Sequence, residues 1–373
     1  MNKKIKLNFE FLEKMRFRAF VPSRLRAFAL SCLRPFVPSP FRAFALSCVF
    51  TLFLVGCKQQ NRFAIDVNQN RVEVEIKRFD KDLILLDTTQ MHSEIERLYQ
   101  EYPDFFPVFI VNILDIEPED TLLVTEFIKE FLSDEEFAAV NQMVLKEFKN
   151  LSDIEKSLST AYTYIHHYFP EMALPDVYFF VSGFNLSIMM ADNIIAMATD
   201  KYLGSDFPLY QQITYRYMLA NMNRENIAPD LISALLFREF RMRSEHNRLI
   251  DNMLYRGKIM YLLSIFMPDV KDEYLIGYTA EQIKWSKKHE RNIWAAMIDQ
   301  KDLFSSDQFT IRKYLNDAPF TSTISPESPG RLGTWVGWQI VKSYMQRNQH
   351  ITLNNLVNTT DYQKILEESG YRP

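Results

Sequence analysis

The pattern of apolar and polar positions predicts a small β-sheet. From Arg71 to Lys77 apolar and charged side chains alternate, which is the period-2 pattern of a strand with one buried face. Two later segments, Asp176–Gly183 and Asn193–Ala198, are short and almost entirely apolar, and we interpret them as two paired strands. The sheet should therefore have one strand early in the folded region and two near the middle of the chain.

Helical patterns and capping signals cover most of the remaining chain. Ser133–Glu136 and Ser152–Glu155 both have the capping-box form, so a helix should begin at each. The segments Tyr102–Pro107 and Ser325–Gly330 contain helix breakers. Further helices are expected just after Asp80 and over 91–101, 209–224, 229–250, 251–266, 279–298, 307–317, 334–347 and 360–368. No change in composition marks a second domain, so the expected fold class is α+β, predominantly α-helical, in a single globular domain with a small sheet.

The N-terminal region has the pattern of an export signal. Arg42 precedes Ala43–Val55, a run without a charge, and this run is shorter than the roughly 17–25 apolar residues of a membrane-spanning helix. The run leads into the residues LVGC, ending at Cys57, which resemble the lipobox of bacterial lipoproteins. There the cysteine receives a diacylglycerol group and a peptidase cuts before it. We predict a lipoprotein signal peptide over 1–56 and a lipidated Cys57 that begins a polar tether over 57–70.

Two features of this region leave alternatives open. An uncleaved anchor is the alternative to a cleaved signal, and it leaves the topology unchanged. Arg18–Leu33 is nearly repeated in Arg34–Val49, and two copies are too few for a solenoid, which needs about three. The repeat suggests a duplicated stretch of coding DNA or a start codon placed too early, with the working signal beginning near Arg34 or Arg42.

Composition and charge limit the classes of function. Removing 56 of the 373 residues leaves 317, which is enough for a substantial core. Cys32, Cys48 and Cys57 all lie in the N-terminal region, so the body has no thiol for a disulfide or for cysteine catalysis. Many basic residues gather in the first 56 positions, which leaves the body more acidic and makes nucleic acid an unsuitable partner.

The body carries no recognisable motif for catalysis or for a cofactor. A Gly-x-Ser-x-Gly elbow, a Walker loop and a dinucleotide fingerprint are all missing from the sequence. His166 and His167 are adjacent and point to different helix faces, which is poor geometry for a metal ion. We therefore expect no cofactor, no metal and no catalytic residue.

The tryptophans lie in the last quarter of the chain. Trp335 and Trp338 are three residues apart on one helix face, so they either pack in the core or form a ligand or partner surface. Gly333 and Gly337, four residues apart on the same helix, would allow another element to approach closely.

Several short motifs together resemble a known family. They are the lipobox at Cys57 and, in chain order, Arg78–Asp80, Tyr102–Phe106, Asp200–Gly204, Gly277–Glu281, Ser328–Arg331, Gly333–Val341 and Ser369–Pro373. In order and spacing they resemble the gliding motility lipoproteins of the GldB family of the Bacteroidetes, over nearly all of 71–373. The resemblance implies an envelope lipoprotein that gliding requires in motile species, with no established enzymatic reaction.

A second resemblance concerns zinc-dependent peptidases of the zincin type. These have short strands, a His-Glu-x-x-His helix and a later Glu-Gly segment. Here the corresponding helix reads REFRM from Arg238 to Met242, and the later segment begins at Arg256. Arginine keeps its charge and a thioether is a poor zinc ligand, so of this set only Glu239 is retained. The resemblance implies a metal-free zincin-like arrangement with degenerate positions at Arg238, Glu239, Met242 and Arg256.

Three functional hypotheses follow. The first is a non-catalytic envelope lipoprotein, anchored at the outer membrane through acylated Cys57, that acts through protein partners in a motility or secretion apparatus; two or three acyl chains suffice for stable anchoring. The second is a divergent peptidase-like hydrolase that uses Glu239. The third is a lipoprotein that binds a glycan or a peptide through its tryptophan-rich last quarter.

Overall fold

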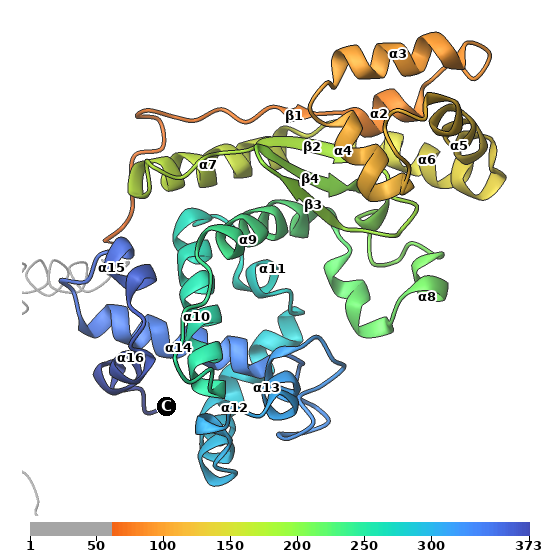
Figure 1. Cartoon of the computed structure of the whole chain (residues 1–373). Coiled ribbons are helices and arrows are strands. Elements are labelled where there is room, and N and C mark those ends of the chain that lie inside the picture. The colour runs from red at the N-terminus through yellow and green to blue at the C-terminus, as the bar shows by residue number, and fades with distance from the viewer. Residues whose placement is uncertain (1–61) are drawn as a thin grey trace, which may run out of the picture. The chain divides into compact units, whose positions relative to one another are not determined.

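The computed structural model describes residues 62–373, in which helices pack on a small sheet (Figure 1). The sheet has the order β1-β2-β4-β3, with β1, β2 and β4 parallel and β3 antiparallel at the edge. The strands are β1 (Ile76–Lys77), β2 (Asp176–Phe180), β3 (Ile188–Ala191) and β4 (Ile194–Ala198). The predicted fold class, α+β and predominantly helical with a small sheet, is confirmed.

The α-helices of the described residues account for most of the ordered secondary structure. They are α2 (Phe79–Ile84), α3 (Met91–Glu101), α4 (Phe106–Phe109), α5 (Thr121–Ser133), α6 (Glu135–Glu147), α7 (Ser152–Tyr168), α8 (Tyr210–Ile213), α9 (Ile227–Glu239), α10 (Leu249–Phe266), α11 (Asp272–Ile276), α12 (Ala280–Asp299), α13 (Gln308–Leu315), α14 (Leu332–Arg347), α15 (Leu353–Asn358) and α16 (Tyr362–Ser369). In residues 62–373, no helix combines the length and the apolar character that crossing a membrane requires.

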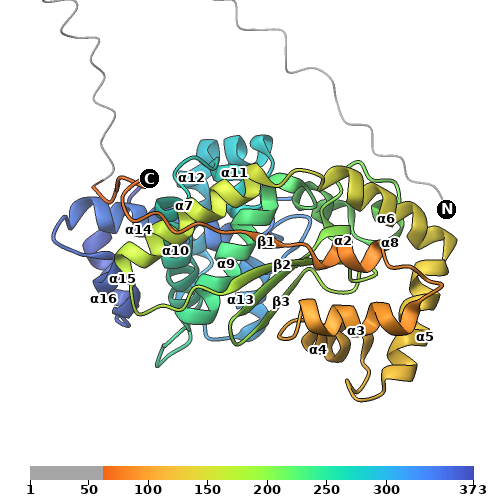
Figure 2. The same cartoon turned by 90° about the horizontal axis from the view of Figure 1, so that it is seen from above.

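The predicted signal peptide 1–56 and Cys57 lie outside the described residues. The residues that follow, assigned by the sequence to a tether, contact the body from Arg62 onward. Arg62 donates a hydrogen bond from Nη2 to the carbonyl of Ile351 (3.0 Å), and Phe63 is buried. The start of the described chain and the C-terminal helices consequently lie side by side (Figures 1 and 2).

The predicted strand over 71–77 pairs with the sheet only at its end. Before Ile76 the chain runs along α7 instead, because α7 side chains accept hydrogen bonds from its alternate backbone N–H groups. The N–H of Val72 donates to Thr163 Oγ1 and that of Val74 to Ser159 Oγ, both at 2.9 Å. The alternation of apolar and charged residues over 71–77 therefore belongs to an extended segment that lies against α7. Only its last two residues form β1.

Two long helices predicted from the sequence are each interrupted. The range 209–224 divides into α8, an extended residue at Thr214 and the 3₁₀-helix Arg216–Asn221. The range 229–250 was expected as one helix, but α9 ends at Glu239 and α10 begins only at Leu249. The start of α10 is fixed by the Asp251 carboxylate, which accepts hydrogen bonds from the Arg248 N–H and from the Ser244 hydroxyl. These polar residues serve as a cap rather than as the solvated face of a longer helix.

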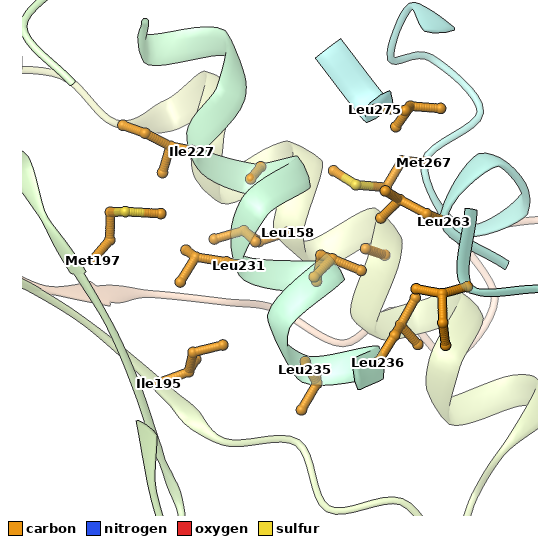
Figure 3. Packing of buried hydrophobic residues seen from close by; sticks show 14 of the residues in the cluster. Leu158, Ile195, Met197, Ile227, Leu231, Leu235, Leu236, Leu263, Met267 and Leu275 are labelled. Atoms are coloured by element: carbon orange, nitrogen blue, oxygen red, sulfur yellow. The ribbon is translucent and has the colours of Figure 1, made fainter. Parts of the chain in front are cut away.

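Both faces of the sheet are covered, as its apolar strands require. On one face, Ile195 and Met197 of β4 contact Ile227, Leu231 and Leu235 of α9, with α7 beyond (Figure 3). On the other face, the aromatic ring of Tyr178 stacks on that of Phe105, 4.5 Å between centroids.

The motifs Arg78–Asp80 and Tyr102–Phe106 meet in this second layer. The ring of Phe79 is fully buried and contacts those of Tyr102, Phe105, Phe106 and Phe109, at centroid distances of 4.9–5.7 Å. The two motifs therefore build the aromatic core on one face of the sheet.

Candidate functional site

A cavity of about 290 Å³ collects residues from four of the motifs that carry the family resemblance. We call it the motif cavity. Lys201 and Tyr202 come from the motif Asp200–Gly204, and the other contributions are Gly277, Arg331 and Thr334. The segments that supply them are up to 133 residues apart in the sequence, so only the tertiary fold brings them together.

The first of these motifs is fixed by its aspartate. The carboxylate of Asp200 is 2% exposed and accepts hydrogen bonds from the backbone N–H groups of Ser182 and Phe184, at 3.1 Å and 2.7 Å. It thereby holds the loop after β2, where Gly183 and Phe184 both have positive φ. This places Lys201 and Tyr202 at the cavity wall.

Asp230 on α9 is, with Asp317, one of the acidic residues that line the cavity. The Tyr202 hydroxyl donates a hydrogen bond to Asp230 Oδ2 (2.8 Å). Burial raises the pKa of Asp230 to about 6, and the Tyr202 hydrogen bond and the Arg331 charge oppose that rise. Asp230 and Ser233 both line the cavity from one face of α9, three residues apart.

Arg331 lines the cavity and connects two segments of its wall. Its Nε lies 3.0 Å from Asp317 Oδ1, and its Nη2 donates to the carbonyls of Ile276 and Gly277, at 2.5 Å and 3.2 Å. The guanidinium is thus satisfied by protein groups and joins the end of α11 to the loop after α13.

Arg256 on α10 has a different environment. Its Nη1 donates to the carbonyl of Leu315 (2.9 Å), and no carboxylate of residues 62–373 forms a salt bridge with it. Burial, and then the nearby charge of Arg331, lower the pKa of Arg256. Two further polar atoms of the cavity residues are buried without a hydrogen-bond partner in the described chain, Thr334 Oγ1 and Asn221 Oδ1.

The four predicted zincin-like positions do not come together. Because α9 ends at Glu239, Met242 lies beyond the helix and does not share a face with Arg238. Glu239 accepts a hydrogen bond from Arg238 Nε (3.0 Å) and lines a separate hollow of about 200 Å³ with Lys258. Of the four, only Arg256 reaches the motif cavity.

Trp335 and Trp338 pack in the core, so the alternative that these two residues form a ligand or partner surface is wrong. Trp335 is 1% and Trp338 is 0% exposed. The Lys342 ammonium lies 3.5 Å from the centroid of the Trp338 ring, a cation–π contact. Within the described part of the chain, no three His, Cys, Asp or Glu side chains group in a way that could hold a metal ion.

Asp230, Ser233 and Asn221 were missed by the sequence analysis. One signal was present: in the stretch IAPDLISALLF, the only polar residues are Asp230 and Ser233, at a spacing that puts them on one helix face. Sequence alone gave no sign of which element this face would meet.

Replacing Asp230 by asparagine should change how stability depends on pH. The folded pKa of about 6 lies above the ordinary aspartate pKa of 3.8, so the native carboxyl retains its proton when the unfolded one has lost it. Stability from this group is therefore present below about pH 4 and is lost as the pH rises through 6, on the order of 2 kcal/mol. The Asp230→Asn protein should gain in stability relative to wild type across this window, measured by urea denaturation at pH 4, 5, 6 and 7.

Asp269→Asn, at an exposed turn, is the control for this prediction. A difference in stability between Asp230→Asn and wild type that is constant with pH would contradict it.

The fold and the site define a mainly helical α+β protein with a mixed four-stranded sheet and a cavity assembled from dispersed motifs. The chain belongs to the family of the gliding motility protein GldB, whose sequence model matches residues 60–373. Among curated proteins none shows a significant match to the chain, and among solved structures none does either. Family membership makes this a lipoprotein associated with gliding motility and indicates the cell envelope as its location.

Proposed function

We propose that this protein is a non-catalytic lipoprotein of the outer membrane that binds a protein of the gliding or secretion apparatus at the motif cavity. The convergence of four family motifs on this cavity carries the proposal. Phe79, which serves only the core, lies in another motif of the same family. The four cavity motifs bring charged and hydroxyl groups to a solvent-accessible hollow. A concave surface with a few such polar groups is typical of a binding site.

Exposed apolar side chains surround the cavity and suit a protein partner. Met218 and Phe237 line it and are 39% and 37% exposed. The segment that supplies Thr214 and Met218 also exposes Ile213 at 46% and Tyr215 at 71%. Clustered apolar exposure of this kind is characteristic of interaction surfaces, and its position beside the charged cavity supports a protein ligand.

The test is affinity purification of the full-length protein, extracted in detergent from membranes of its native host, followed by quantitative mass spectrometry. Envelope proteins that co-purify with wild type should be lost from the double variant Tyr215→Ser/Met218→Ser. Leu122→Ser is the matched control, because Leu122 is 70% exposed on α5 and does not line the cavity. Equal recovery with the double variant, or loss with Leu122→Ser instead, would place the interface elsewhere.

The anchor is tested separately by Cys57→Ala. Without the thiol no diacylglycerol can be attached, so the protein should move from the membrane pellet to the soluble fraction of the periplasm. Fractionation followed by immunoblotting measures this shift, and Cys48→Ala is the control. Retention of Cys57→Ala in the membrane fraction would show that another segment holds the protein there.

A further inference from the structure

The guanidinium of Arg256 lies at the wall of the motif cavity, and no carboxylate of residues 62–373 forms a salt bridge with it. Its hydrogen bond to Leu315 leaves the other guanidinium nitrogens without a partner among residues 62–373. The two acids that line the same cavity are already engaged, since Asp317 pairs with Arg331 and Asp230 accepts from Tyr202. A partly buried charge without an ion-pair partner of its own is costly to the folded protein, and a ligand that supplies a carboxylate would offset this cost.

The hydroxyl of Thr334 is a second group in the motif cavity that lacks a partner among the described residues. Thr334 is 5% exposed, lines the motif cavity and has a hydroxyl with no partner in the described chain. A hydroxyl can donate one hydrogen bond, and a guanidinium can donate several in a planar fork. Together they present donors that a carboxylate, with two acceptor oxygens, would satisfy.

The size and walls of the cavity restrict the carrier of that carboxylate. A volume of about 290 Å³ is at the lower end for small-molecule sites, and it suits one side chain or a chain end. Met218, Phe237 and Leu275 provide apolar walls. A residue with an apolar body and a carboxylate therefore fits better than a free inorganic anion.

We propose that the motif cavity binds a carboxylate of a partner polypeptide, held by Arg256 and by the hydroxyl of Thr334, with the apolar part of the same residue against Met218 and Phe237. This inference rests on the proposed function and specifies what that site recognises. The carboxylate can belong to a C-terminus or to a Glu or Asp side chain.

The test compares three peptides in ligand-observed NMR titrations with the full-length protein in detergent. They are acetyl-Leu-Phe with a free carboxylate, the same peptide as its amide, and acetyl-Phe-Glu amide. Wild type should bind at least one carboxylate peptide ten-fold or more tightly than acetyl-Leu-Phe amide. Preference for the first peptide identifies a chain terminus as the ligand and preference for the third a side chain, and both support the inference. Equal binding of acids and amide, or no binding at all, would overturn it.

Variants connect this preference to the two residues. Arg256→Gln should abolish the preference for acids, Arg256→Lys should retain part of it, and Thr334→Val should reduce it a few-fold. Arg238→Gln is the matched control, because Arg238 lies on α9 without lining the cavity. If the Arg256 variants fail to fold by circular dichroism, Thr334→Val alone decides, and an unchanged preference in it counts against the inference. Envelope partners that still co-purify with folded Arg256→Gln would overturn the carboxylate site while leaving the proposed function intact.

Discussion

Replacing Gly337 by alanine is expected to destabilise the protein by about 3 kcal/mol or more, although the same change in an exposed helix stabilises by about 1 kcal/mol. Gly337 on α14 lies directly against α10. A Cβ at this position would be 1.9 Å from the carbonyl oxygen of Met253, and a Cβ at Gly257 would be 2.3 Å from the carbonyl oxygen of Gly337. These neighbours are backbone atoms, so no side-chain rotation can make room, and the two helices would have to separate.

Separation would disturb a large part of the core. α14 also carries Trp335 and Trp338, and both indoles are buried. Chemical denaturation followed by tryptophan fluorescence should show a lower midpoint for Gly337→Ala, and Gly257→Ala should behave alike. Gln346→Ala, at an exposed position of α14, should stay within about 0.5 kcal/mol of wild type. A midpoint for Gly337→Ala equal to that of wild type would mean that the helices do not cross at these glycines.

The fold was predictable where local signals are strong. α3 matches the sequence prediction, and the helix over 279–298 appears as α12 with a cap at Thr279. α7 begins at Ser152 but without the predicted capping box, because its N-cap residue is Leu151 and the Glu155 carboxylate accepts from the Ile76 N–H. The capping box predicted at Ser133 is shifted by one residue. The Asp134 carboxylate, rather than the Ser133 hydroxyl, accepts hydrogen bonds from the N–H groups at the start of α6. Such local hydrogen bonds depend on a few neighbouring residues, so the sequence contains nearly all that determines them.

The remaining differences depend on contacts between distant segments. β3 was missed because its residues become a strand by pairing with β4, across a two-residue turn. Before Ile76, the strand expected over 71–77 is replaced by hydrogen bonds to side chains of α7, which lie about 90 residues later. Family motifs could be found in the sequence, but their meeting at one cavity, and the presence of Asp230 there, follow from tertiary packing alone.

Removing the carboxylate of Asp80 is the second change for which we expect a large effect, a loss of about 3–5 kcal/mol in Asp80→Ala. Asp80 is fully buried, and its two oxygens accept from Arg78 Nε (2.7 Å) and Nη2 (3.0 Å). Arg78 also donates to the carbonyl of Phe148, which ties α2 to the end of α6. Without Asp80 the guanidinium would remain in the protein with only this carbonyl as a partner.

A double-mutant cycle separates the ion pair from the packing around it. Arg78→Met/Asp80→Ala removes both charges together, so it should be more stable than the sum of the Arg78→Met and Asp80→Ala losses predicts, because no unpaired charge is left. Glu73→Ala breaks a largely exposed pair with Arg71 and should cost no more than about 1 kcal/mol. Denaturation midpoints of these proteins provide the measurement, and an Asp80→Ala protein as stable as Glu73→Ala would contradict it. Since Phe79 between the two charged residues anchors the aromatic core, a large loss would assign this motif to folding and leave recognition to the motifs at the cavity.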